Sequence, residues 1–296
     1  MSDLVDRYKR NYRITEDISE EQVNRHLELE LQLTAQLLRS TPADRRQVFV
    51  DAYSRLYREL PWLNVADDGR AVDARDWERL VGPPPASVYE VGSGRGTLAR
   101  ALAARGYRVE ATEITLERET AAEEGVHWSE TDGVHLARFA RGTPYDAVIS
   151  NQVIEHLHPD DLLEHLRGAH ALLRPGGRYV LETPLFYEGP ADLSRVFGFD
   201  RAVGMHLREY THRQLHRAAL EAGFARVEVP FGLPRALRAR FDLPLRPSAP
   251  YGRYLRAVEA LVDRLPPARR KRVARMLKVP LFPRTLRVVA IKAPAT

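Results

Sequence analysis

The sequence predicts an α/β fold with a largely parallel sheet, and three observations support this class. An apolar run over residues 88–91 breaks into glycines at alternate positions and then into a helical pattern over residues 98–105. Short apolar stretches and helical patterns then alternate as far as residue 229, which is typical of βαβ units. The composition, with 44% hydrophobic and 29% charged residues, is that of a globular protein. At 296 residues the chain is long enough for one α/β core with appended elements.

The glycine turn at residues 92–96 is the feature on which the functional prediction depends. Glycines lack Cβ atoms, so the backbone of such a turn can approach a ligand closely at the carboxyl end of a strand. The pattern E-x-G-x-G-x-G, from Glu90 to Gly96, differs from the dinucleotide fingerprint G-x-G-x-x-G because its third glycine comes one residue early. This spacing disfavours an NAD-dependent oxidoreductase, which stays an alternative class.

Polar residues follow the next strands at their carboxyl ends. The expected core strands are residues 88–91, 108–112, 126–129, 145–151, 178–183 and 226–229, with helices over residues 159–173 and 212–222. Glu113 ends the second strand roughly 20 positions after the first glycine, where a carboxylate accepts hydrogen bonds from both hydroxyls of a ribose. Asp132 follows the third strand, and the fourth ends in Asn151 and runs on to Glu155 and His156. These side chains are therefore expected at one edge of the sheet.

Several of these motifs together closely resemble the class I S-adenosylmethionine (SAM) methyltransferases, in particular the small-molecule branch that includes ubiquinone-biosynthesis O-methyltransferases. The motifs are E-V-G-S-G-R-G at residues 90–96, Y-D-A-V at 145–148, E-H at 155–156 and L-R-P-G-G at 173–177. The resemblance covers residues 88–229. It implies a Rossmann-like sheet of seven strands, of which six are parallel and the last, residues 286–292, is antiparallel.

The resemblance also implies SAM as the cofactor and assigns residues to it. Glu90 is implied to face the cationic end of the methionine moiety, and Asp132 to hold the adenine amino group. Together with the ribose contact, the expected cofactor-binding residues are Glu90, Gly92, Gly94, Gly96, Glu113, Asp132, Gly133 and Asn151.

His156 is the leading candidate for a general base, and Glu155 for the residue that orients it or binds substrate. Methyl transfer from a sulfonium is an in-line displacement, for which the acceptor must be positioned and deprotonated. An imidazole titrates at about pH 6.5, which suits this role. The structural alternative is that Glu155 caps the following turn while His156 only packs against the cofactor.

A divalent metal is a second hypothesis for the same residues. In the ubiquinone-type enzymes and the small-RNA 2′-O-methyltransferases the motif E-x-x-E-H binds a metal ion, joined in the RNA enzymes by a further histidine. Here Gln152 replaces the first glutamate, which removes one anionic ligand, and His206 resembles the later histidine. Glu155, His156 and His206 are thus the candidate ligands. The other histidines considered are expected at solvated positions, namely His26, His127, His158, His165 and His170.

Four regions are expected along the chain. They are an N-terminal helical region or cap (1–85), the SAM-binding core (86–230), a basic and mainly helical insertion (231–285), and the last strand with the tail (286–296). Within the first region, residues 1–18 are expected to be irregular, and helices are expected over residues 19–40, 41–60 and 72–81. Their apolar stripes either cover the cofactor pocket or pack on the core, and such stripes favour packing.

The insertion carries the net positive charge of the chain. Between Arg235 and Lys278 there are thirteen basic and three acidic residues, whereas the whole chain carries only +5. This local excess predicts a contact with an anionic membrane surface or a phosphorylated substrate, and nucleic acid is disfavoured. The alternative is that these arginines are simply solvated. We expect a cytoplasmic protein, either free or peripheral to a membrane, because no apolar signal or spanning segment is seen.

The methyl acceptor is expected to be a hydroxyl of a small molecule or of a lipid or sugar intermediate, with an amine second. The chain has no cysteine, which excludes thiolate nucleophiles and disulfides. It also lacks the D/N-P-P-Y/F motif of amino-methylating nucleic-acid enzymes. An aromatic loop with Phe186, Tyr187, Phe197 and Phe199 either lines the acceptor pocket or closes the core. Two further alternatives are an inactive SAM-binding module and a membrane-peripheral enzyme with a lipid-linked acceptor.

Overall fold

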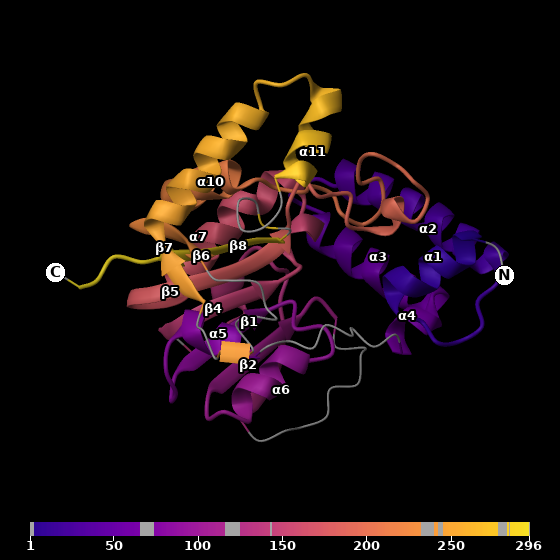
Figure 1. Cartoon of the computed structure of the whole chain (residues 1–296). Coiled ribbons are helices and arrows are strands. Elements are labelled where there is room, and N and C mark those ends of the chain that lie inside the picture. Colours follow the sequence, from indigo (N-terminus) through magenta and orange to yellow (C-terminus); the bar gives the residue numbers. More distant parts are fainter. Residues whose placement is uncertain are drawn as a thin grey trace.

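The computed structural model describes residues 3–65, 74–115, 125–142, 144–231, 240–241, 245–277, 283 and 285–295. Its strands are β1 (Ser87–Val91), β2 (Arg108–Glu113), β3 (Val126–Glu130), β4 (Tyr145–Asn151), β5 (Leu173–Pro184), β6 (Arg226–Phe231), β7 (Arg246–Ser248) and β8 (Thr285–Ile291). They form one sheet in the order β3-β2-β1-β4-β5-β8-β6-β7 (Figure 1). The expected α/β fold is therefore confirmed.

The direction of the strands agrees with the prediction except at one edge. Strands β3, β2, β1, β4 and β5 are parallel neighbours. Strand β8 lies antiparallel between β5 and β6, so β6 runs parallel to the first five. The prediction of seven strands is wrong by one, because β7 pairs antiparallel with β6. This three-residue strand contains Pro247 and has no apolar alternation, so the sequence gives little signal for it.

Helices surround the sheet. They are α1 (Asp3–Tyr12), α2 (Glu20–Arg39), α3 (Arg45–Glu59), α4 (Pro61–Val65), α5 (Ala74–Val81), α6 (Thr97–Ala103), α7 (Leu162–Leu172), α8 (His212–Glu221), α10 (Ala249–Val262) and α11 (Pro267–Met276). Short 3-10 turns cover Leu136–Arg138, Ile154–His156, Pro159–Asp161 and Leu193–Arg195. In the described residues, no helix combines the length and the apolar character needed to cross a bilayer.

Side chains that alternate along the strands build a core on each face of the sheet. Along β4, Val148 joins the core beneath α7 and α8, whereas its neighbours Ala147 and Ile149 join the core beneath α5 and α6. All three side chains are fully buried. Burial on both faces is what a parallel sheet covered by helices requires.

The N-terminal helices pack together on one side of the sheet, to its right in Figure 1. Helix α2 begins as expected, with a capping box in which Gln22 N donates to Ser19 Oγ and Ser19 N donates to Gln22 Oε1. The irregular lead-in expected for residues 1–18 is wrong, because α1 occupies most of it. That helix is amphipathic and buries Val5 and Tyr8, a pattern too short to stand out in the sequence.

The insertion before β8 contributes α10 and α11, which project above the sheet in Figure 1. A buried glutamate on α10, Glu259, attaches this hairpin to the core. Its Oε1 accepts from the backbone N of His212 at 2.9 Å, and its Oε2 accepts from the backbone N of Arg213 at 2.8 Å. Because these groups lie at the start of α8, Glu259 caps that helix from a distant part of the chain.

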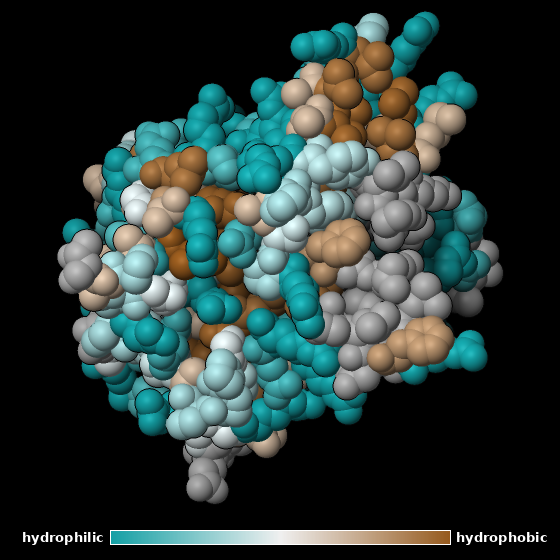
Figure 2. Space-filling view, turned by 60° about the vertical axis from the view of Figure 1, so that its left-hand side comes forward, coloured by the Kyte–Doolittle hydropathy of each residue, from teal (hydrophilic) through white to brown (hydrophobic). Residues whose placement is uncertain are grey.

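The α10–α11 hairpin exposes apolar side chains among charged ones. Leu261 on α10 is 60% exposed and Met276 on α11 is 75% exposed. In Figure 2 the projecting part at the top of the molecule accordingly carries an apolar strip bordered by hydrophilic residues. Of the expected basic residues, Arg235, Arg238 and Lys278 lie outside the described residues.

Candidate functional site

A cavity of about 880 Å³ lies at the carboxyl ends of β1, β2 and β4. Its volume is within the range of small-molecule sites. The predicted residues that line it are Glu90, Gly92, Gly94, Glu113, Asp132, Gly133, Asn151, His156 and His206. Gly96 and Glu155, which were also predicted, do not line it. The structure thus brings most of the predicted residues to one cavity.

The glycine turn between β1 and α6 has the left-handed backbone that favours glycine. Gly92, Gly94 and Gly96 have φ values of 64°, 56° and 75°. A Cβ atom on Gly92 would lie 2.6 Å from Cγ2 of Val153, and one on Gly96 would lie 2.5 Å from Cζ2 of Trp128. Gly96 therefore serves the packing of α6 on β3, while Gly92 and Gly94 keep the backbone next to the cavity.

Glu113 ties the end of β2 to this turn. Its Oε1 accepts from the backbone N of Gly94 at 2.6 Å, and its Oε2 accepts from the backbone N of Ile114 at 3.0 Å. A carboxylate held by two backbone donors is fixed in position. The side chain lines the cavity at the place where a ribose contact is expected.

Three buried polar atoms beside the cavity have no hydrogen-bond partner among the described residues. They are Oε2 of Glu90, Oδ1 of Asn151 and Nε2 of Gln152. Burial raises the pKa of Glu90 to about 8. Gln152 also has a left-handed backbone, with φ of 60°. Buried polar atoms without a hydrogen-bond partner are rare in folded proteins. The three atoms here are explained if a polar ligand in the cavity forms hydrogen bonds with them.

Asp132 is held by its own loop. Its Oδ1 accepts from the backbone N of Val134 at 2.8 Å and of His135 at 2.7 Å, and Oδ2 lies 2.7 Å from Nδ1 of His135. Gly133, next to it, has φ of 71°, and its carbonyl oxygen accepts a hydrogen bond from Nδ1 of the buried His165 at 2.6 Å. The loop is thus rigid on the side facing the cavity, and the adenine contact of Asp132 stays a prediction.

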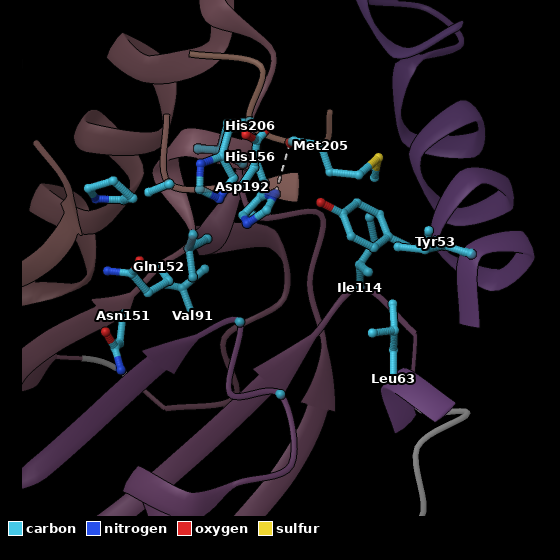
Figure 3. Close-up of a pocket in the computed structure, with 18 of the residues that line it drawn as sticks. Tyr53, Leu63, Val91, Ile114, Asn151, Gln152, His156, Asp192, Met205 and His206 are labelled. Atoms are coloured by element: carbon cyan, nitrogen blue, oxygen red, sulfur yellow. Dashed lines mark hydrogen bonds between the residues drawn. The ribbon is translucent and has the colours of Figure 1, made fainter. Parts of the chain in front are cut away.

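Glu155, His156 and His206 form a cluster, of which Figure 3 shows His156 and His206 side by side at the upper edge of the cavity. Their potential ligand atoms all lie within 4.8 Å of one another. His156 donates from Nδ1 to the carbonyl of Met205 at 2.9 Å, drawn as a dashed line, and its ring meets that of His206 edge-on. The fully buried Glu155 accepts from the hydroxyl of Thr183 at 2.9 Å.

The pKa values of the two histidines of this cluster are shifted in opposite directions. Burial and the neighbouring His206 lower the pKa of His156 to about 3. For His206, burial opposes protonation, but its hydrogen bond to Glu209 and the charges of Glu155 and Asp192 outweigh burial and raise its pKa. His156 is therefore neutral at physiological pH with its proton on Nδ1, and its Nε2 is free of a proton.

The opposite wall of the cavity comes from segments outside the glycine turn and the strand ends. Phe49, Tyr53, Leu56 and Tyr57 of α3 line it, so this helix covers the pocket as well as packing on the core. In Figure 3 Tyr53 reaches from α3 toward His156, and the two rings are 6.4 Å apart. The apolar stripe of α3 was visible in the sequence, but its direction toward the cavity was not.

The aromatic loop does not form this wall. None of Phe186, Tyr187, Phe197 and Phe199 lines the cavity. Tyr187 is buried in the core, where its hydroxyl donates to Asp263 at 2.6 Å. Instead, Met205 and Asp192 line the cavity, and they come from the same long segment after β5.

The prediction that the remaining histidines are solvated is wrong for three of them. His26 and His165 are fully buried and His158 nearly so. His26 lies on the inner face of α2, between the hydroxyl of Tyr8 and Oε1 of Glu30, at 2.8 Å from each. Oε2 of Glu30 in turn accepts from the backbone N of Met205. The N-terminal helices are thus linked by hydrogen bonds to the residue that holds His156.

The comparisons with known proteins agree with the geometry. A family model described as a methyltransferase domain matches residues 67–229, more than half of the chain. This range contains the glycine turn, Glu113 and the Glu155–His156 pair. A search of curated proteins gives no match.

Solved structures that resemble the chain include three at low identity. One is the 1,6-didemethyltoxoflavin-N1-methyltransferase of Burkholderia thailandensis with S-adenosylhomocysteine (22% identity, 70% of this chain and 88% of that chain, TM-score 0.48). Another is phospholethanolamine N-methyltransferase 2 of Haemonchus contortus (16% identity, 89% of this chain and 61% of that chain, TM-score 0.49). A third is an O-methyltransferase family protein of Burkholderia thailandensis (16% identity, 69% of this chain and 66% of that chain, TM-score 0.41).

Proposed function

The chain belongs to the methyltransferase domain family, and we propose that it transfers a methyl group from SAM to a hydroxyl of a small molecule. An amine is the second choice of acceptor. The observation that supports this proposal is the single cavity shared by the glycine turn, Glu113 and His156. The motifs of the ubiquinone-type branch, E-H and L-R-P-G-G, favour the hydroxyl.

The charge of the cavity suits the cofactor. Among its described lining residues the acids are Glu30, Glu90, Glu113, Asp132, Glu188 and Asp192, against the bases Arg10, Arg13 and Arg195. SAM carries a sulfonium and an ammonium group, which an acidic site stabilises. We propose that Glu113 holds the ribose, Glu90 the methionine end and Asp132 the adenine. When bound, SAM supplies an already activated methyl group.

His156 is proposed to act on the acceptor hydroxyl. Its Nδ1 is committed to the carbonyl of Met205, so Nε2 can accept the hydroxyl proton. An imidazole with a pKa of about 3 is a weak base, so its contribution lies at the lower end of the general-base range. Much of the rate would then come from holding the acceptor in line with the methyl group.

The compact cluster of Glu155, His156 and His206 supports a metal as the second candidate. Two histidines and one carboxylate are a common donor set for divalent metals. Each histidine has its Nδ1 directed to another group, Met205 O or Glu209, which leaves Nε2 for a metal. Exhaustive chelation separates the two candidates: full activity afterwards would refute the metal, and activity restored only by a divalent ion would support it.

Binding of the cofactor is expected to release a proton from Glu90. Its carboxyl is neutral below about pH 8, and the ligand ammonium would favour the ionised form. Affinity for S-adenosylhomocysteine should therefore rise between pH 6 and 7, by up to about tenfold per pH unit. Calorimetry at pH 7 in two buffers of different ionisation enthalpy should show release of about one proton, and none in Glu90→Gln. Equal release by both proteins would contradict the assignment.

The acceptor class is tested by methyl transfer from radiolabelled SAM to a panel of small molecules that present matched hydroxyl and amine groups. We expect label in hydroxylated acceptors. Transfer to amines alone would refute O-methylation. Cofactor binding without transfer to any acceptor in the panel or in a metabolite extract would favour an inactive SAM-binding module.

A further inference from the structure

A second cavity, of about 770 Å³, adjoins the cofactor cavity and has the opposite charge. The two share His206 as a lining residue. Its walls come from the segment before α8, from α8 itself and from α11. The described basic residues that line it are Arg201, Arg208, Arg213, Arg217, Arg270 and Lys271, against the acids Glu209 and Asp263. The basic insertion thus contributes to a defined cleft as well as to the surface.

Both acids of this cleft are already engaged. Glu209 accepts from the backbone N of Ala191 at 2.7 Å and lies next to His206. Asp263 accepts from the hydroxyl of Tyr187 at 2.6 Å and from Nη1 of Arg213 at 2.7 Å. Both carboxylates therefore have hydrogen-bond partners other than Arg201, Arg208 and Arg217.

The basic residues fall into two groups. Arg213, Arg270 and Lys271 have structural partners. Lys271, for example, donates from Nζ to the carbonyls of Asp200 at 2.7 Å and Gly189 at 3.1 Å. By contrast, the guanidinium groups of Arg201 and Arg217 form no hydrogen bond or ion pair within the described part of the chain.

Arg208 resembles this second group. Its guanidinium stacks over the ring of Tyr210, with the carbon 5.4 Å from the ring centre, and forms no hydrogen bond or ion pair with the described residues. Three exposed guanidinium groups thus face a cleft beside the site of methyl transfer. A guanidinium presents planar pairs of donors that match the oxygens of a phosphate, and several around one cleft make an anion site.

We propose that this cleft binds a phosphate group of the methyl acceptor, with Arg201, Arg208 and Arg217 as the phosphate ligands. The inference rests on the proposed function and names its substrate class as a phosphate-bearing molecule. The acidic cavity takes the cationic cofactor, and the basic cleft takes the anionic end of the acceptor. His206 lies between them, so the reactive hydroxyl of an acceptor held in the cleft can extend past it toward His156.

The phosphate can belong to a free metabolite or to a lipid. The exposed apolar residues of the α10–α11 hairpin, seen at the top of Figure 2, lie on the same insertion that supplies Arg270 and Lys271. The two sources share one chemistry at the cleft, and separate arms of the experiment distinguish them.

The first arm titrates the protein with inorganic phosphate at physiological salt and follows binding by phosphorus NMR. A double variant, Arg201→Gln with Arg217→Gln, should weaken saturable binding by at least about tenfold. The matched control is Arg253→Gln with Arg272→Gln, which removes the same charge from exposed positions on α10 and α11 outside the cleft. It should change affinity by less than about twofold.

The second arm measures flotation of the same three proteins with phosphatidylglycerol vesicles, and with phosphatidylcholine vesicles as the neutral control. If the wild type and the control variant bind the phosphatidylglycerol vesicles and the cleft variant does not, the phosphate belongs to a lipid. If inorganic phosphate binds to the wild type and the control variant but not to the cleft variant, and no protein binds vesicles, the phosphate belongs to a free metabolite. Failure of the wild type to bind either probe, or equal loss in both variants, overturns the cleft.

A parallel titration with S-adenosylhomocysteine keeps the two proposals apart. The cofactor should bind all three proteins equally, because none of the substituted arginines lines its cavity. If the wild type did not bind S-adenosylhomocysteine, the proposed function would be refuted. The phosphate titration would then still test the cleft independently.

Discussion

Replacement of Glu113 by glutamine is expected to lower the affinity for S-adenosylhomocysteine by about 100-fold. The carboxylate is the proposed acceptor for two ribose hydroxyls, and each hydrogen bond to a charged group contributes about 1.5–3 kcal/mol. It also fixes the glycine turn through Gly94 N, so its loss affects the shape of the site as well as the contact. Isothermal titration calorimetry measures the change directly.

A neighbouring glutamate provides the control. Glu130 is the register partner of Glu113 across β2 and β3, but it is exposed and does not line the cavity. Glu130→Gln should therefore bind the ligand as the wild type does. If Glu113→Gln, shown by thermal melting to be folded, bound equally well, its role in the cofactor site would be refuted.

Removal of the His156 imidazole is expected to lower kcat by about 100-fold while the affinity for S-adenosylhomocysteine stays nearly unchanged. The imidazole is proposed to accept the hydroxyl proton at Nε2, and it has no proposed bond to the cofactor. The measurement is turnover of His156→Ala with the acceptor identified by the hydroxyl and amine panel.

The matched control for this substitution is His127→Ala, at an exposed position on β3. It should retain full turnover. The pH profile adds a second test: because His156 is neutral from about pH 3 upward, its titration should produce no acidic limb near neutrality. Unchanged kcat in His156→Ala would leave only the packing role for this residue.

The parts of the fold that could be predicted are those with strong local signals. Strands β1, β4 and β5 contain apolar runs next to turn residues, and the capping box of Ser19 marks the start of α2. Helix α1 and strand β7 were missed because each is short and is stabilised by packing or pairing with distant segments. Such tertiary contacts leave little trace in a local pattern.

The candidate site divides in the same way. Gly92, Glu113 and His156 could be identified because each lies at or just after the carboxyl end of a parallel strand, and these ends meet at one edge of the sheet. Tyr53 and Met205 could not, because they reach the cavity from a preceding helix and from the long segment after β5. Their positions depend on how those segments fold over the sheet, which spacing does not encode.

The site proposed here is tested most directly by calorimetric titration of the wild-type protein with S-adenosylhomocysteine, with NADH as the control ligand. We predict binding at one site with an affinity in the micromolar range and no heat from NADH. Binding of NADH instead, or no binding of S-adenosylhomocysteine to protein shown to be folded, would contradict the assignment of the cavity formed by the glycine turn and Glu113.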